Sequence, residues 1–133
     1  YAILALDQVG CNVQEYLDGL HAAIRNALRE FDVPAEIRRD APGIWSGERR
    51  VAQVGVAIRD WVAGYGCIVN VQPELQPFRW IRYDEQKLPM TSIERERRRP
   101  VSLPAVRRAL VERFAEQFGF ALVSRVHRPA LPR

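Results

Sequence analysis

Residues 50–72, RVAQVGVAIRDWVAGYGCIVNVQ, decide the fold of this chain. The stretch is rich in valine and isoleucine, has no apolar stripe at helical spacing, and is interrupted by the charged pair Arg59 and Asp60. This pattern is typical of two β-strands joined by a tight turn, which we predict at about 50–59 and 61–72. Three of the residues in these strands are glycines: Gly55, Gly64 and Gly66. Glycine inside a strand usually marks a bulge or a close approach of another segment.

Helical periodicity appears on both sides of the predicted hairpin. Residues 11–31 carry one apolar stripe, and Asn12 followed by Glu15 is a plausible capping pair at its start. Residues 102–120 carry a second stripe, with Gly119 at the position that commonly follows a helix. Two amphipathic helices are therefore predicted.

Shorter apolar segments supply further strands of a sheet. Residues 2–6 are predicted as a buried strand, 33–39 as an edge strand and 120–124 as a last strand. The sum is an α+β fold, a mixed and largely antiparallel sheet with the two amphipathic helices laid on it. Residues 1–125 are expected to form the domain, and 126–133 a frayed tail.

Two polar stretches are predicted to lie outside these elements. Residues 40–50, DAPGIWSGERR, carry the Pro-Gly and Ser-Gly pairs of a turn-rich hairpin. Residues 73–100 resemble a loop with one helical turn near 74–79. The charge run ERERRR at 94–99 is predicted to be a solvated face.

Composition limits the function classes. The 133 residues have a net charge of +4, but nineteen of the twenty basic residues are arginine and acidic residues are interspersed, so no nucleic-acid partner is expected. No apolar run approaches the roughly 20 residues of a membrane span, so no membrane association is expected. Cys11 and Cys67 lack metal spacing, which predicts no metal site and favours a reducing, cytoplasmic setting.

Four motifs follow one another without a gap between Asp40 and Phe78. They are a D-A-P-G-[VI]-[WY] turn, a G-x-x-K-I-A-x-[IL]-G strand, an H-G-x-A-L-N-V strand and a P-F pair. In this order they resemble the C-terminal half of the octanoyltransferases of lipoate synthesis, which are related in fold to biotin and lipoate protein ligases. The earlier family motifs, R-G-G and H-G-P-G-Q, are absent. The resemblance therefore implies a ligase-like domain that is incomplete at the N-terminus, roughly its C-terminal three-fifths.

The resemblance implies an activity and its partners. Family members move an octanoyl group from acyl carrier protein to a lysine of a lipoyl domain, through a thioester on a cysteine whose pKa a lysine lowers. No cofactor is implied. A further chain supplying the N-terminal half is a third expected partner.

Three reacting positions of the family are changed here. Arg50 stands at the lysine position, Asp84 is the best counterpart of the cysteine, and Tyr65 replaces a histidine. Arginine keeps the positive charge but does not release its proton, and a carboxylate beside it stays ionised. The pair suits a salt bridge better than acyl transfer through a nucleophile.

The resemblance also implies the residues of an acyl pocket on the two strands: Gln53, Val54, Gly55, Tyr65, Gly66, Cys67 and Ile68. Gln53 stands where the family has a small residue and is expected to narrow the pocket. Cys67 is either a relocated nucleophile or a buried apolar thiol.

Two functions therefore remain open from the sequence. One is a divergent or incomplete octanoyltransferase. The other is a non-catalytic pseudoenzyme, or the C-terminal subunit of a split lipoate ligase or transferase, that binds a carrier or a partner chain.

Overall fold

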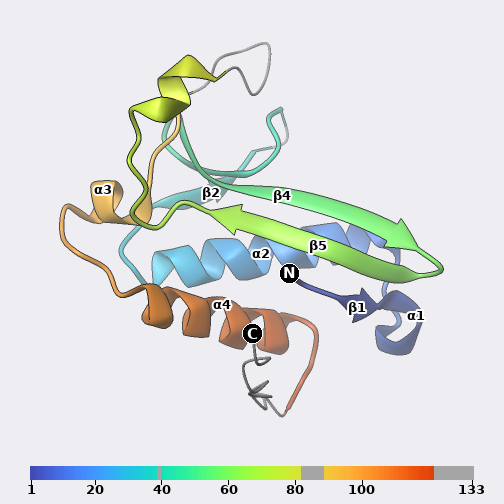
Figure 1. Cartoon of the computed structure of the whole chain (residues 1–133). Helices are drawn as coiled ribbons and strands as arrows, with labels where there is room; N and C mark the ends of the chain where they lie inside the picture. Colours follow the sequence, from blue (N-terminus) through green and yellow to red (C-terminus); the bar gives the residue numbers. More distant parts are fainter. Residues whose placement is uncertain (39, 82–88, 122–133) are drawn as a thin grey trace, which may run out of the picture.

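The computed structural model describes residues 1–38, 40–81 and 89–121. They form a sheet with its two long helices on one face (Figure 1). The strands are β1 (Leu4–Ala5), β2 (Ala35–Ile37), β3 (Ile44–Ser46), β4 (Arg49–Arg59) and β5 (Val62–Val69). The helical elements are α1 (Leu6–Val9), α2 (Val13–Arg29), η1 (Pro77–Trp80), α3 (Ile93–Arg97) and α4 (Leu103–Gln117).

The predicted α+β fold class is confirmed. The strand order is β1-β5-β4-β3-β2 and every pairing in the sheet is antiparallel. A parallel bridge joins Arg50 to Met90, outside the named pairings. The order places the long β4–β5 hairpin at the centre, with the short strands at the two edges.

The β4–β5 hairpin is confirmed where the sequence predicts it. Its turn residues Asp60 and Trp61 both have left-handed backbones, with φ of 50° and 61°. Two such residues match the right-handed twist of a hairpin. β5 ends at Val69 instead of residue 72, because the next two carbonyls turn to α3: those of Asn70 and Val71 accept from the amides of 93 and 94.

Helices α2 and α4 lie side by side under the sheet and bury the core between themselves and the strands (Figure 1). The predicted capping pair is present: the Asn12 side chain accepts from the Glu15 amide, and the Glu15 carboxylate accepts from the Asn12 amide. At the same end of the helical layer, the Phe118 ring packs 5.5 Å from that of Tyr16. The two helices are thus positioned by their own sequences and joined by aromatic contact.

A β-bulge in β4 determines which side chains face away from the helices. Ile44 pairs with Ala52 but the adjacent Trp45 pairs with Arg50, so Val51 is an extra residue. Val51 and Ala52 are both buried in the core. Because a bulge resets the alternation of a strand, Arg50 falls on the outer face of the sheet, opposite the helices.

Some segment predictions need correction. Residues 2–6 hold only a two-residue strand, because α1 begins at Leu6. The 94–99 charge run is not simply a solvated face, because it contains most of α3 and the Glu96 side chain is only 8% exposed. Most of the predicted strand at 120–124, and the tail at 126–133, lie outside the described residues.

Candidate functional site

A hollow of about 520 Å³ lies on the outer face of the β4–β5 hairpin. It is lined by Tyr1, Gln53, Gly55, Val56, Ala57, Tyr65, Gly66, Cys67 and Ile68. The strand register places Gly55 opposite Gly66 and Gln53 opposite Ile68. The structure therefore brings together six of the seven residues predicted for the pocket. Val54 is the exception, because alternation along the strand packs its side chain against the core.

The two glycines facing each other have different local roles. A Cβ added at Gly66, where φ is 142°, would lie 2.8 Å from the Ala2 backbone nitrogen. Gly66 therefore allows the N-terminal segment to run close to β5. A Cβ at Gly55 would meet nothing within 4 Å. Packing does not explain that glycine, and its effect is to leave the floor of the hollow open.

Arg50 lies on the same face of β4 as Gln53, three residues and thus about 10 Å farther along the strand. Its side chain is buried, and its guanidinium carbon lies 5.3 Å from the centre of the Trp45 ring. Trp45 is itself fully buried, and its indole N–H donates to the Ala41 carbonyl at 3.1 Å. The cation is therefore held at one end of the hollow by aromatic packing.

The turn before Arg50 also holds it in place. Gly43 has a φ of 113°, and a Cβ there would lie 2.6 Å from the Ala52 carbonyl oxygen and 2.9 Å from Cδ of Arg50. The D-A-P-G turn thus lies directly on the arginine. This contact supports the interpretation that the turn positions the residue at the family's lysine site.

The backbone of Arg50 is joined to the segment that leads to α3. Its amide donates to the Pro89 carbonyl and its carbonyl accepts from the Thr91 amide, both at 2.9 Å. Asn70, at the end of β5, donates from its side chain to the Thr91 carbonyl at 3.0 Å. Segment 89–92 is therefore anchored to both strands of the hairpin.

The predicted reacting residues are only partly described. Asp84 lies outside the described residues, so its pairing with Arg50 stays a prediction. Tyr65 is 62% exposed at the rim of the hollow, with its ring 6.4 Å from that of Tyr1. Tyr65, which stands where the family has a histidine, therefore faces the hollow.

Cys67 lines the hollow but is also packed against the core. Burial raises the pKa of its thiol. A reactive cysteine needs the opposite, a lowered pKa that favours the thiolate. The relocated-nucleophile hypothesis stays a prediction, and the environment of this sulfur works against it.

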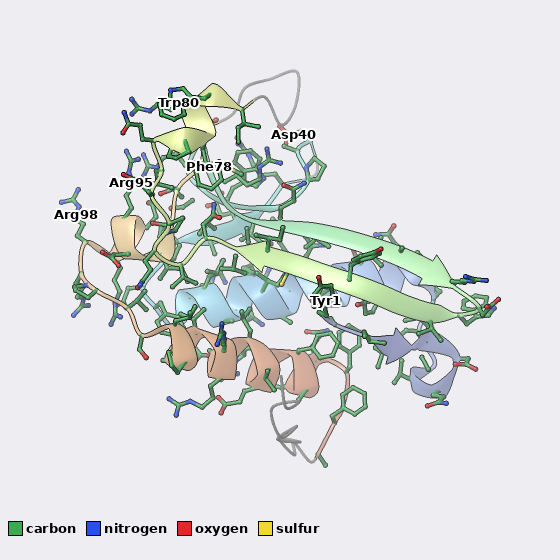
Figure 2. The ribbon with its side chains drawn as sticks, viewed as in Figure 1. Tyr1, Asp40, Phe78, Trp80, Arg95 and Arg98 are labelled. Atoms are coloured by element: carbon green, nitrogen blue, oxygen red, sulfur yellow. The ribbon has the colours of Figure 1, made fainter. Side chains whose placement is uncertain are left out.

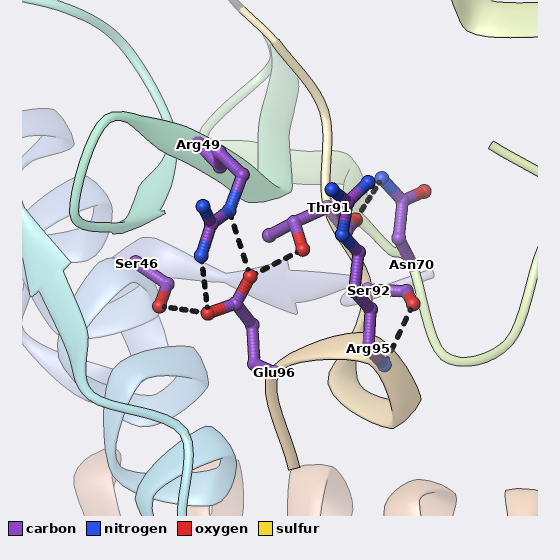
Figure 3. Close-up of polar contacts among 7 residues, drawn as sticks. All are labelled: Ser46, Arg49, Asn70, Thr91, Ser92, Arg95 and Glu96. Carbon is purple, nitrogen blue, oxygen red and sulfur yellow. Dashed lines mark hydrogen bonds and ion pairs between the residues drawn. The ribbon is translucent and has the colours of Figure 1, made fainter. Parts of the chain in front are cut away.

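Sequence reasoning missed a buried carboxylate beside the site (Figure 3). Glu96 accepts from Nε and Nη2 of Arg49 at 2.9 Å each, from the Ser46 hydroxyl at 2.9 Å, and from the Thr91 hydroxyl. Burial raises the pKa of Glu96, but hydrogen bonds from Arg49, Thr91 and Ser46, with the Arg49 charge, lower it further, to about 2. This network fixes α3 to β3 and β4.

A signal for this helix was present in the sequence. Ser92 caps α3 by accepting from the Arg95 amide, and acidic residues follow in the first turn. Ser followed by acidic residues is the usual start of a helix. The partners of Glu96 had no such signal, because they are distant in sequence.

The arrangement is a largely apolar hollow with a buried cation, Arg50, fixed farther along the same face of β4. Among the residues the structure describes, no group of three or more histidine, cysteine or acidic residues could hold a metal ion. The described helices also include none with the length and apolar character to cross a membrane.

The family model of the lipoyl protein ligase A/B catalytic domain matches residues 1–115. The chain belongs to this family. Its similarity to octanoyltransferases is confirmed: it is 32% identical to the octanoyltransferase of Azotobacter vinelandii over 91% of the chain, and 36% identical to that of Geobacter metallireducens over 86%. These matches cover 56% and 54% of the two relatives, so the chain spans about half their length.

Solved structures agree on the fold. The apo biotin protein ligase of Aquifex aeolicus superposes with a TM-score of 0.69 at 16% identity, covering 88% of this chain and 50% of the ligase. A bipartite lipoate protein ligase from Thermoplasma acidophilum, studied with its E2 lipoyl domain, gives 0.65 at 17% identity, covering 82% and 47%. At these identities the likeness shows the biotin and lipoate ligase fold alone.

Proposed function

We propose that this chain forms one wall of the acyl site of an octanoyltransferase of lipoate biosynthesis. The site accepts an octanoyl group from acyl carrier protein and passes it to a lysine of a lipoyl domain. The relatives have a further half that this chain does not span. A segment equivalent to that half, in the same or another chain, completes the site. We place the reaction in the cytoplasm, where the chain would encounter both acyl carrier protein and the lipoyl domain.

One observation supports this proposal above the others. The hollow over Gly55 and Gly66 is built from the residues that the family resemblance assigns to the acyl pocket, and Arg50 is fixed on the same face. The hollow has few polar lining groups, as a site for an octanoyl chain requires. Gly55 keeps the floor clear without any packing need.

We propose a direct transfer, because the family's cysteine is not present at its aligned position. The lysine amine attacks the thioester carbonyl of the carrier, the guanidinium of Arg50 stabilises the oxyanion, and the carbon–sulfur bond then breaks. The amine proton passes to the carboxylate of Asp84 and finally to the departing thiolate. A fixed cation beside the carbonyl and a carboxylate acting as base are the two groups that this route needs.

Filling the hollow tests the proposal. Gly55→Val adds a side chain where nothing lies within 4 Å, so the strand should stay folded while the floor closes. The affinity for octanoyl-loaded carrier should fall to that for unloaded carrier, measured by isothermal titration. Gly64→Val is the matched control, since its Cβ makes an ordinary 3.8 Å contact and the residue does not line the hollow. Equal affinity of the unmodified chain for loaded and unloaded carrier would reject the acyl site.

The second candidate function is non-catalytic binding of a carrier or partner chain. The raised pKa of Cys67 and the replacement of lysine by Arg50 favour it, because neither supplies an activated nucleophile. Intact-mass analysis of a lipoyl domain incubated with the chain and octanoyl-loaded carrier separates the two. Octanoylated lipoyl domain without an adduct on the chain supports direct transfer. Acyl-dependent binding without product supports the non-catalytic candidate.

A further inference from the structure

A second hollow, of about 510 Å³, lies beside α3 and plays no part in the chemistry above. Three arginines line it, Arg95, Arg98 and Arg99, with Glu94 as the one acidic lining residue that the structure describes. We refer to the three arginines as the α3 basic surface. Gln72 and Leu75, which follow β5, line the other side.

The inward side chains of α3 hold the helix without using this surface. Ile93 is fully buried, and Glu96 is bound by the network with Arg49. Arg97 turns back to the body, with Nε 3.8 Å from an Asp32 carboxylate oxygen and its guanidinium carbon 5.9 Å from the centre of the Phe31 ring. Changing the outward arginines should therefore leave the helix in place.

The outward arginines are poorly neutralised. The guanidinium groups of Arg95 and Arg98 have no hydrogen bond or ion pair with any residue that the structure describes. Arg98 extends away from the body of the molecule (Figure 2), and the Arg95 side chain runs beside Thr91 toward Asn70 (Figure 3). Arg99 lies 3.0 Å from Asp32, but its side chain remains 63% exposed. A local excess of fixed positive charge attracts an anionic partner from solution.

The α3 basic surface is physically joined to the candidate site. Segment 89–92, which hydrogen-bonds the Arg50 backbone, runs directly into α3. Arg95 lies within α3, four residues after Thr91 in the chain. Gln72 is only four residues after Ile68, which lines the acyl hollow. A partner bound here sits at the Arg50 end of the hollow.

We propose that the α3 basic surface docks the acyl-donating carrier protein, an inference that rests on the proposed function. Such a carrier presents acidic side chains and holds its acyl thioester on an arm joined through a phosphate. Arginine forks bind carboxylate and phosphate oxygens in pairs, which gives both charge and geometry for recognition. The lining residues described include no aromatic ring, so the stacking platform of a single-stranded nucleic-acid site is lacking.

The test is a binding titration of bacterial acyl carrier protein that carries the phosphate-linked arm but no acyl group. Arg95→Glu/Arg98→Glu should weaken binding roughly tenfold or more at low salt and flatten its salt dependence, since exposed interface charges act mainly through long-range attraction. Carrier lacking the arm should lose part of the affinity for the unmodified chain but little for the double variant. The melting temperature of the double variant should be unchanged.

Arg59→Glu is the matched control, because Arg59 is 94% exposed at the hairpin turn, at the opposite end of the molecule from α3 (Figure 1). An equal loss with Arg59→Glu, or none with the double variant, would overturn the proposal. The proposal would also be overturned if the double variant lost affinity for a lipoyl domain or for single-stranded RNA but kept its affinity for the carrier. Because the carrier in this titration has no acyl group, it measures docking alone. A failure of the docking proposal is therefore distinguishable from a failure of the proposed acyl site, which is tested by the difference in affinity between loaded and unloaded carrier.

Discussion

At the scale of single residues, the placement of Arg50 depends on side chains that no charge pattern reveals. Trp45 packs beneath its guanidinium and Gly43 leaves room for its Cδ. Arg50 could be matched to the family's lysine position by alignment. Its direction could not, because the bulge at Val51 decides which face it occupies.

The coupling of Trp45 to Arg50 can be measured with a double-mutant cycle. Trp45→Leu and Arg50→Met each destabilise the fold, since both side chains are buried. The double variant should lose about 1 kcal/mol less than the sum of the singles, because a desolvated cation–π contact contributes on that order. Urea unfolding gives the free energies. Additive losses would mean that the ring only fills space.

Gly43 should be the most sensitive turn residue in the D-A-P-G-I-W-S-G stretch. Gly43→Ala places a Cβ against the Ala52 carbonyl in a backbone with φ of 113°, and should cost more than about 2 kcal/mol. Gly47→Ala is the control, because φ is 55° there and nothing lies within 4 Å, so only about 1 kcal/mol of backbone strain is expected. Thermal melting compares the two. Equal losses would show that crowding at Arg50 contributes nothing.

At the scale of elements, α3 depends on its tertiary contacts. It has five residues, too short to be stable alone, and it is held by the Glu96 network together with the buried Ile93. Met90–Ser92 runs from the Arg50 bridge into this helix. Loss of the Glu96 network should therefore disturb both the basic surface and the backbone next to Arg50.

This dependence predicts an acid transition. Because the pKa of Glu96 falls from an ordinary 4.5 to about 2 on folding, its contribution is complete above pH 4.5 and is lost as pH falls toward 2. The difference corresponds to on the order of 3 kcal/mol. Urea midpoints measured at pH 7, 5 and 3 should drop at the lowest pH. Glu96→Gln should be less stable at pH 7 and show a smaller drop; an unchanged drop would assign it to other groups.

At the scale of the whole molecule, apolar surface remains open beside the core. A groove of about 620 Å³ lies between β5, α2 and α4, and Ile3, Leu103 and Val111 around it are 70%, 39% and 49% exposed. β1 pairs with only two residues of β5, Val62 and Ala63. Exposed apolar patches and strand edges favour association.

We therefore predict that the isolated chain self-associates. Light scattering at increasing concentration should show a mass above that of one 15.3 kDa chain. Val111→Glu, in the groove, should reduce association, and Ile37→Glu, on β2 at the far edge of the sheet, should not. A monomer at all concentrations would contradict the prediction.

The sequence by itself determined the central hairpin and the two long helices, through the local signals of alternation, helical spacing and caps. The contiguous motifs of the family resemblance predicted six of the residues that line the hollow. Tertiary structure alone decided the direction of Arg50, the orientation of Val54 away from the pocket, and the burial of Glu96 within a charge run. Each of these depends on contacts between segments far apart in the chain, and local periodicity carries no information about such contacts.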